Sequence, residues 1–256
     1  MKKALFIVAA AFWFLVPLNA QNELYQKRHF TYKEKTLPYR ILFPENYDRT
    51  KNYPLVVFLH GAGERGNDNE KQLVHGSWLY SNEQNRQKYP AIVIFPQCPS
   101  EGYWAPIAER KDGFSYPEKA PATAPMQLLI RLISELEKKE AVDKSRIYVT
   151  GLSMGGMGTF DLITRYPRKF AAALPICGGV NAKRLKKIVR MPIRIYHGDA
   201  DQIVSPEHSK NAYVELKANG AQNVELFMFP NVGHDSWTSA FAQDDFLSWM
   251  FSNKLK

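Results

Sequence analysis

A serine between two glycines stands where an expected strand meets an expected helix. Residues 151–155 read Gly-Leu-Ser-Met-Gly, directly after the apolar run Ile147–Thr150 and directly before the helical pattern Met154–Arg165. In such a tight turn the glycines leave room for neighbouring backbone, and the serine hydroxyl is exposed above the sheet. A G-x-S-x-G pattern alone is weak, and a helix-capping serine is the alternative. This context favours Ser153 as a nucleophile for attack on an acyl carbon.

A serine hydroxyl needs a general base, and the chain has six histidines. Where a strand-to-helix turn carries the nucleophile, the chain order is serine, then acid, then histidine. The order and the local pattern exclude five of the six: His29, His60, His75, His197 and His208. The remaining one, His234, lies in the loop after the last expected strand. We therefore expect His234 to be the base.

The base in turn needs a carboxylate that orients its ring. Two aspartates follow the expected strand Ile193–Tyr196 closely, Asp199 and Asp201. Asp199 is barely out of the strand and could instead brace the turn. Asp201 lies deeper in the loop, where its side chain can reach the histidine, so it is the preferred acid.

Acyl transfer also needs backbone N–H groups for the oxyanion of the tetrahedral intermediate. The amide of Met154, directly after the nucleophile, is one expected donor. The turn His60-Gly61-Ala62-Gly63 after the strand Leu55–Leu59 should supply the other. Ala62 is the first choice and Gly63 the second, and we expect His60 to hold this turn through local hydrogen bonds. No metal or cofactor is expected.

The elements that must position these residues alternate between short apolar strands and helical patterns, which indicates an α/β class with a mostly parallel sheet and helices on both faces. Eight strands are expected; the first two are more polar and alternate, as antiparallel edge strands do. Helices are expected at 125–139, 154–165, from Ser205 to Gly220, and from Thr238 or Ser239 to Phe251. The eight strand candidates are Tyr25–Tyr32, Tyr39–Phe43, Leu55–Leu59, Ala91–Phe95, Ile147–Thr150, Ala171–Ile176, Ile193–Tyr196 and Val224–Phe229.

Two connections differ in length in a way that bears on substrate access. Only about fifteen residues separate Cys177 from Ile193, too few for a large lid. The segment Gln97–Ala124 is long and rich in proline and aromatic residues, so we expect a functional loop without a continuous helix. Its Trp104, and Trp237 just after the expected base, are candidate substrate-binding residues, with core packing as the alternative.

The first twenty residues have the pattern of a signal peptide: a basic start, an apolar stretch from Ala4 to Val16, and a small residue at Ala20. We expect export to the periplasm or the outside, with residues 21–256 as one catalytic domain and no stable membrane anchor after cleavage. The expected sheet order separates Cys98 and Cys177 by roughly 14 Å, which is beyond the reach of a disulfide. Both are therefore expected to be free thiols.

The net charge of +9 comes from scattered basic residues that are not interleaved with aromatic ones, so a nucleic-acid partner is not expected. The tightest basic cluster, residues 183–187, alternates with apolar positions and fits the solvated face of a short helix.

The runs Phe58–Gly66, Gly151–Gly156, His197–Asp201 and Gly233-His234 together resemble exported bacterial esterases of the α/β-hydrolase superfamily. These are described as carboxylesterase/phospholipase-like or prolyl-oligopeptidase-like, with feruloyl and acetylxylan esterases among their relatives. The resemblance covers nearly all of residues 21–256 and implies the α/β-hydrolase fold and a serine mechanism.

The sequence therefore predicts a serine carboxylic-ester hydrolase that works through an acyl-enzyme and acts on acyl or feruloyl esters of carbohydrates. Its expected partner is a small-molecule or oligosaccharide ester substrate. The alternatives are a serine peptidase of prolyl-oligopeptidase type, a short-chain carboxylesterase or lipase, and a hydrolase-fold protein that binds without catalysis.

Overall fold

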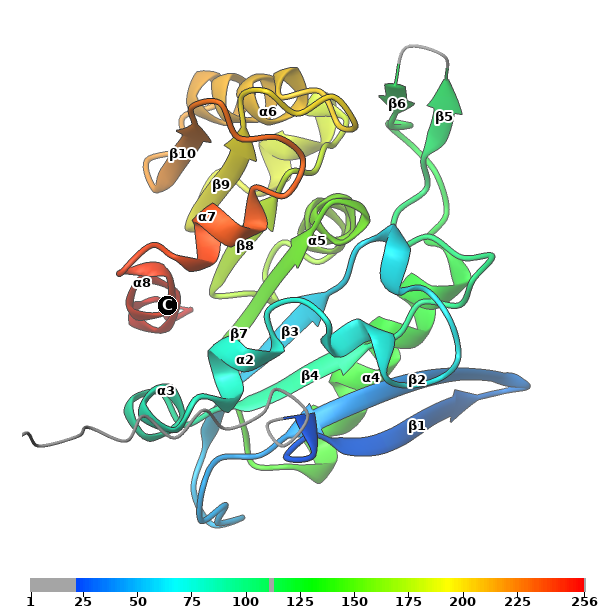
Figure 1. The fold of residues 1–256 in the computed structure, drawn as a ribbon, viewed down its shortest axis with the longest axis vertical. Coiled ribbons are helices and arrows are strands. Elements are labelled where there is room, and N and C mark those ends of the chain that lie inside the picture. The colour runs from blue at the N-terminus through cyan, green and yellow to red at the C-terminus, as the bar shows by residue number, and fades with distance from the viewer. Residues whose placement is uncertain (1–21, 111–112, 256) are drawn as a thin grey trace, which may run out of the picture.

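An eight-stranded sheet forms the centre of the molecule, a computed structural model that describes residues 22–110 and 113–255 (Figure 1). The strand order is β1-β2-β4-β3-β7-β8-β9-β10. The pairs β1–β2 and β2–β4 are antiparallel and the others are parallel, as predicted. The strands are β1 Gln26–Tyr32, β2 Lys35–Leu42, β3 Tyr53–Leu59, β4 Ile92–Pro96, β7 Val142–Leu152, β8 Ala172–Ile176, β9 Ile193–Gly198 and β10 Val224–Phe229.

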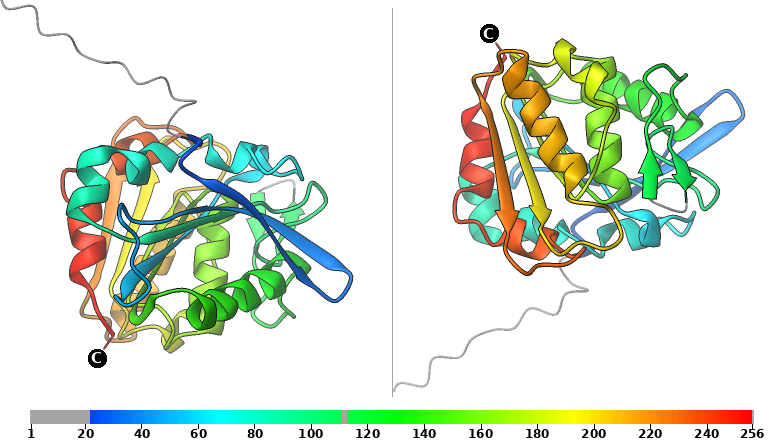
Figure 2. Two further views of the ribbon diagram at one scale, coloured as in Figure 1. Left: turned by 90° about the horizontal axis from the view of Figure 1, so that it is seen from below. Right: turned by 90° about the horizontal axis from the view of Figure 1, so that it is seen from above.

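Helices cover both faces of this sheet (Figure 2). Side chains of one strand alternate between two buried clusters: in β3, Leu55 and Val57 join one, whereas Val56 and Phe58 join the other. The first cluster is closed by α4 (Ala124–Lys139), α5 (Met154–Arg165) and α6 (Glu207–Ala218). The second is closed by α2 (Ser77–Ser81), α7 (Trp237–Phe241) and α8 (Phe246–Ser252). A strand apolar on both faces is the pattern of a sheet buried on both sides.

Two predictions about the segments between these elements were wrong in detail. The last helix is not continuous, because the chain turns between α7 and α8, where Asp245 bonds Arg194 at 2.7 Å. The segment Gln97–Ala124 is not wholly irregular: it contains a hairpin of β5 (Ala108–Arg110) and β6 (Gly113–Ser115), which projects from the body in Figure 1. Helices α2 and α3 (Glu83–Lys88) were not predicted.

Short helices occupy the remaining connections. They are η1 (Ala62–Glu64) after β3, η2 (Lys71–Leu73) before α2, and η3 (Ala182–Lys187) between β8 and β9. Element η3 is the predicted short basic helix, with Leu185 buried beneath it, and no large lid is inserted there.

Both cysteines are free and buried, as predicted. Among residues 22–110 and 113–255, no helix has the length and apolar character needed to span a membrane. The predicted signal peptide, 1–20, lies outside the described residues.

Candidate active site

The turn between β7 and α5 holds Ser153 in a strained backbone conformation. Its φ is 54° and its ψ is −117°, and its N–H donates to Ile176 O at 2.9 Å. A Cβ on Gly155 would lie 1.9 Å from Leu59 O, and one on Gly151 would lie 2.5 Å from Gly155 O. No side chain therefore fits at either flanking position. A strained non-glycine residue held this firmly is a frequent mark of a functional site.

The structure brings the three predicted triad residues together. His234, in the loop after β10, has Nε2 at 2.9 Å from Ser153 Oγ and Nδ1 at 2.8 Å from Asp201 Oδ2. Because a carboxylate only accepts, the Nδ1–H of His234 donates to Asp201. Nε2 then has its lone pair toward the serine hydroxyl, which is the tautomer that a general base needs.

Asp201 is held ionised by its hydrogen-bond donors. Its Oδ1 accepts from the amides of Ile203 and Val204 at 2.8 and 3.0 Å, and its Oδ2 accepts from His234. Burial acts to raise the pKa of this carboxyl, but the bonds from His197, from His234 and from the two amides outweigh it and hold the pKa well below its usual value. The competing Asp199 accepts from the amide of Asn231 at 2.7 Å and braces the loop.

A second histidine that was not predicted at the site also contacts Asp201. His197, at the end of β9, is fully buried; its Nε2 lies 3.1 Å from Asp201 Oδ2 and 2.9 Å from Val204 O. Since both neighbours are acceptors, Nε2 carries the proton and Nδ1 accepts from Ser209 Oγ at 2.7 Å. The chain order excludes His197 as the general base but not as a hydrogen-bond partner of the acid. Its position four residues before Asp201 was the one sequence signal for this contact.

The two predicted oxyanion donors flank the nucleophile. Ala62 begins η1 and Met154 begins α5, and both line the same cleft as Ser153. His60 holds the turn before Ala62, as predicted. Its Nδ1–H donates to Gly61 O at 2.6 Å, and its Nε2 accepts from Cys98 N at 2.9 Å. Burial lowers the pKa of His60 to about 4, so the ring stays neutral.

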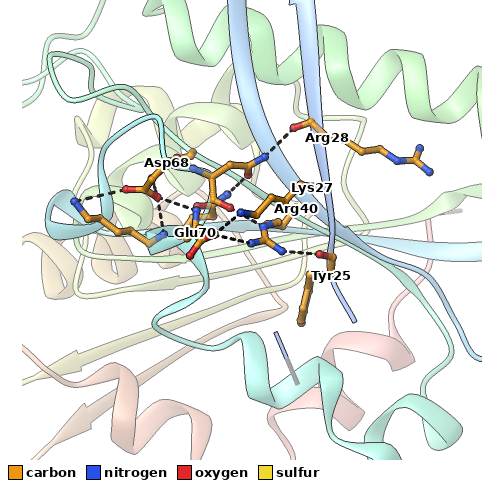
Figure 3. A network of polar contacts seen from close by, with 10 residues as sticks. Tyr25, Lys27, Arg28, Arg40, Asp68 and Glu70 are labelled. Atoms are coloured by element: carbon orange, nitrogen blue, oxygen red, sulfur yellow. Dashed lines mark hydrogen bonds and ion pairs between the residues drawn. The ribbon is translucent and has the colours of Figure 1, made fainter. Parts of the chain in front are cut away.

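A polar network anchors the chain that follows η1 (Figure 3). Asp68 Oδ1 accepts from the amides of Glu70 and Lys71 and from Gln97 Nε2. Burial opposes ionisation of Asp68, but these bonds outweigh it and lower the pKa to about 2. The buried Arg40 donates to Asn69 O at 2.6 Å and to Tyr25 O at 2.7 Å. The loop that carries Ala62 is thereby tied to β1, β2 and the end of β4.

Trp104 does not face the cleft, so its prediction as a substrate-binding residue was wrong. Its side chain is 0% exposed and packs against Gly158, where a Cβ would lie 2.4 Å from Trp104 Cβ. Its indole N–H donates to His60 O at 3.2 Å. The ring thus supports the oxyanion turn, and it packs this closely against α5 because residue 158 is a glycine. Trp237 does line the cleft, as expected.

The cleft above Ser153 has a volume of about 310 Å³. The 97–124 segment contributes Tyr103, Ile107 and Phe114 in place of Trp104. Sequence reasoning placed this segment at the cleft but did not identify these three side chains.

One group of potential metal ligands lies in the described part of the chain: Cys177, Asp201 and His234 have donor atoms within 4.8 Å of one another. Asp201 and His234 already bond each other. Burial raises the pKa of the Cys177 thiol to about 12, so it stays protonated and is a poor ligand. The group fits a triad better than a metal centre.

The mostly parallel eight-stranded sheet with this strand-to-helix turn defines the chain as an α/β-hydrolase. Residues 46–249 match the profile of the Phospholipase/Carboxylesterase family, and the chain belongs to that family.

Individual proteins that resemble this chain in sequence or structure include esterases and a lysophospholipase-like protein. A crystal structure of a thermostable esterase is 31% identical with a TM-score of 0.84, covering 92% of this chain and 64% of that one. The mouse (Mus musculus) lysophospholipase-like protein 1 is 27% identical over 197 residues, 70% of this chain and 79% of that protein. A bifunctional acetylxylan esterase/xylanase from Neocallimastix patriciarum is 27% identical over 155 residues, 60% of this chain but only 20% of that protein.

Proposed function

We propose that this protein is a serine carboxylic-ester hydrolase that works through an acyl-enzyme. The observation that carries the proposal is the continuous hydrogen-bonded line from Asp201 through His234 to Ser153 Oγ. Its distances of 2.8 and 2.9 Å lie within the range that the proposed acid, base and nucleophile need. A protein that used the fold only to bind would not need this line, nor a strained serine at its end.

In the proposed reaction Ser153 Oγ attacks the ester carbonyl while His234 Nε2 takes its proton. The oxyanion is bound by the amides of Met154 and Ala62. His234 then protonates the leaving alcohol, and the acyl group stays on Ser153 Oγ. Water attacks this acyl-enzyme while His234 takes its proton; the acyl–Oγ bond breaks, the carboxylic acid leaves, and His234 returns the proton to Ser153 Oγ. Asp201 stabilises the imidazolium in both halves.

We further propose acyl or feruloyl esters of carbohydrates as substrates. Support comes from the esterase relatives, one of them an acetylxylan esterase/xylanase, and from the 310 Å³ cleft, to which no large lid contributes. Phe114, Ile107 and Met157 give the cleft an apolar side that suits an acyl group. Peptide hydrolysis is the alternative that this chemistry leaves open. Export of the mature chain 21–256 stays part of the proposal.

The test is hydrolysis of matched acetyl substrates by the purified protein and by Ser153→Ala. We expect wild-type turnover of 4-nitrophenyl acetate and of acetylated xylo-oligosaccharides, and a loss of about a thousandfold or more in Ser153→Ala. Ser100→Ala, at an exposed loop position, is the control and should retain full activity. Turnover of peptide anilides but of no ester would overturn the proposal.

A further inference from the structure

The cleft has a second, polar side that the triad does not use. Glu64, the last residue of η1, and His75 both line it. The Glu64 side chain is only 13% exposed, and its Oε1 lies 3.8 Å from His75 Nε2. Sheltered carboxylates are normally paired or hydrogen-bonded.

Glu64 lies close to the reacting centre. A Cβ added to Gly61 would be 3.0 Å from Glu64 Oε2 and 3.7 Å from Ser153 Cβ, so Glu64 Oε2 and Ser153 Cβ are less than about 7 Å apart. Within the described part of the chain, no side chain or amide donates a hydrogen bond to this carboxylate, and the His75 ring is its one basic neighbour within ion-pair distance. Its acceptor oxygens are therefore available to a ligand in the cleft.

Trp237 shows which part of an ester would meet Glu64. Its ring centroid lies 5.6 Å from that of His234 on one side and 5.2 Å from that of His75 on the other. The leaving oxygen must lie against His234 Nε2, because this nitrogen protonates it. An alcohol that extends from there along Trp237 would reach His75 and Glu64, which leaves Phe114 and Met157 for the acyl group.

We infer that Glu64, supported by His75 and Trp237, is the alcohol-side recognition site, and that it selects neutral polyhydroxylated alcohols over alcohols that carry a phosphate or a carboxylate. This inference rests on the proposed ester hydrolysis and specifies its alcohol. Sugar hydroxyls can donate to the free carboxylate oxygens, and a sugar ring can lie against the indole. An anionic alcohol would place its negative charge beside the Glu64 carboxylate in a partly desolvated cleft. Arg65 also lines the cleft, but its guanidinium donates to the carbonyls of Ala62 and Gly102.

The test compares esters with one acyl group and different alcohols. Glu64→Ala removes the acceptors, whereas Glu64→Gln keeps the shape and one acceptor but removes the charge. In Glu64→Ala, the ratio of kcat/KM for an acetylated xylo-oligosaccharide to kcat/KM for 4-nitrophenyl acetate should fall about tenfold or more, as the loss of a hydrogen bond to a charged group implies. In Glu64→Gln, the ratio for 4-acetoxybenzoate to 4-nitrophenyl acetate should rise about tenfold.

Glu101→Gln, on an exposed loop, is the matched charge control and should change neither ratio. A misfolded variant would lose activity on all three esters together and cannot produce the expected rise. If the wild type hydrolyses 4-nitrophenyl acetate but both ratios are unchanged in the Glu64 variants, the recognition site is refuted and ester hydrolysis stands. If the wild type hydrolyses no ester, the proposed function itself fails.

Discussion

The Asp201 carboxylate accepts all of its side-chain hydrogen bonds. A substitution that puts a donor in its place should therefore lower activity. Replacing it by asparagine puts an amide opposite His234 Nδ1, which favours the wrong tautomer of the imidazole. Asp201→Asn should therefore lower kcat by about a thousandfold or more. Asp199→Asn keeps an oxygen for the amide of Asn231 and should cost less than tenfold. The comparison is turnover of 4-nitrophenyl acetate by two folded variants; greater damage in Asp199→Asn would show that the acid is misplaced.

His197 is a positioning residue, since it contacts Asp201 and not the nucleophile. His197→Leu leaves Asp201 Oδ2 without one donor and raises the pKa of the carboxyl toward its usual value. We expect kcat to fall about ten- to a hundredfold, with the acid limb of the pH–rate profile moved to higher pH. His197→Gln can still donate from a similar place and should restore most of the rate. Equal loss in both variants, with an unmoved pH profile, would mean that His197 only fills space.

At the scale of elements, β7, α5 and β3 are packed too closely for any side chain at Gly155. Gly155→Ala would drive its methyl group into Leu59 O, so β3 or α5 must move. We expect it to lower the free energy of unfolding by about 3 kcal/mol or more, measured by urea denaturation. Gly63→Ala is the matched control, because a Cβ there meets nothing within 4 Å. Similar stability in the two variants would contradict this view of the elbow.

Apolar runs predicted the central strands β3, β4, β8 and β9 because these are buried along their whole length, and alternation predicted the more exposed β1. The pattern predicted α5 to the residue because a nucleophile turn fixes its start. The Trp104 error has the opposite cause. The sequence pattern around a tryptophan in a long loop is the same whether its side chain faces a cleft or the core. Here the close contact with Gly158 places the side chain in the core. His75 was not predicted at the cleft because α2 and its approach were not predicted, and Glu64 was not predicted there because only the backbone of its turn was considered.

For the whole molecule, the buried His60 links stability to pH. Its pKa falls from 6.5 to about 4 on folding. Below pH 6.5 His60 binds a proton in the unfolded chain but not in the folded chain, and this favours unfolding. The contribution of neutral His60 to the free energy of unfolding is therefore complete above pH 6.5 and is lost as the pH falls toward 4. From pH 7 to 5 the loss from His60 alone should be about 2 kcal/mol.

Urea denaturation at pH 7 and at pH 5 measures this loss. Between the two pH values, the free energy of unfolding of His60→Gln should fall by about 2 kcal/mol less than that of the wild type. His29→Gln, on an exposed position of β1, is the control and should behave as the wild type does. An identical pH dependence in His60→Gln and the wild type would show that His60 does not titrate on unfolding.

The central claim is that one serine carries the acyl group, and trapping that species tests it most directly. The protein is mixed with excess 4-nitrophenyl acetate, quenched in acid within the first turnover, digested and analysed by mass spectrometry. We predict one added acetyl group on the peptide that contains Ser153, in the wild type and in an Asp201→Asn variant that deacylates slowly, and none in Ser153→Ala. An acetyl group on another residue, or rapid ester turnover by Ser153→Ala, would contradict the account.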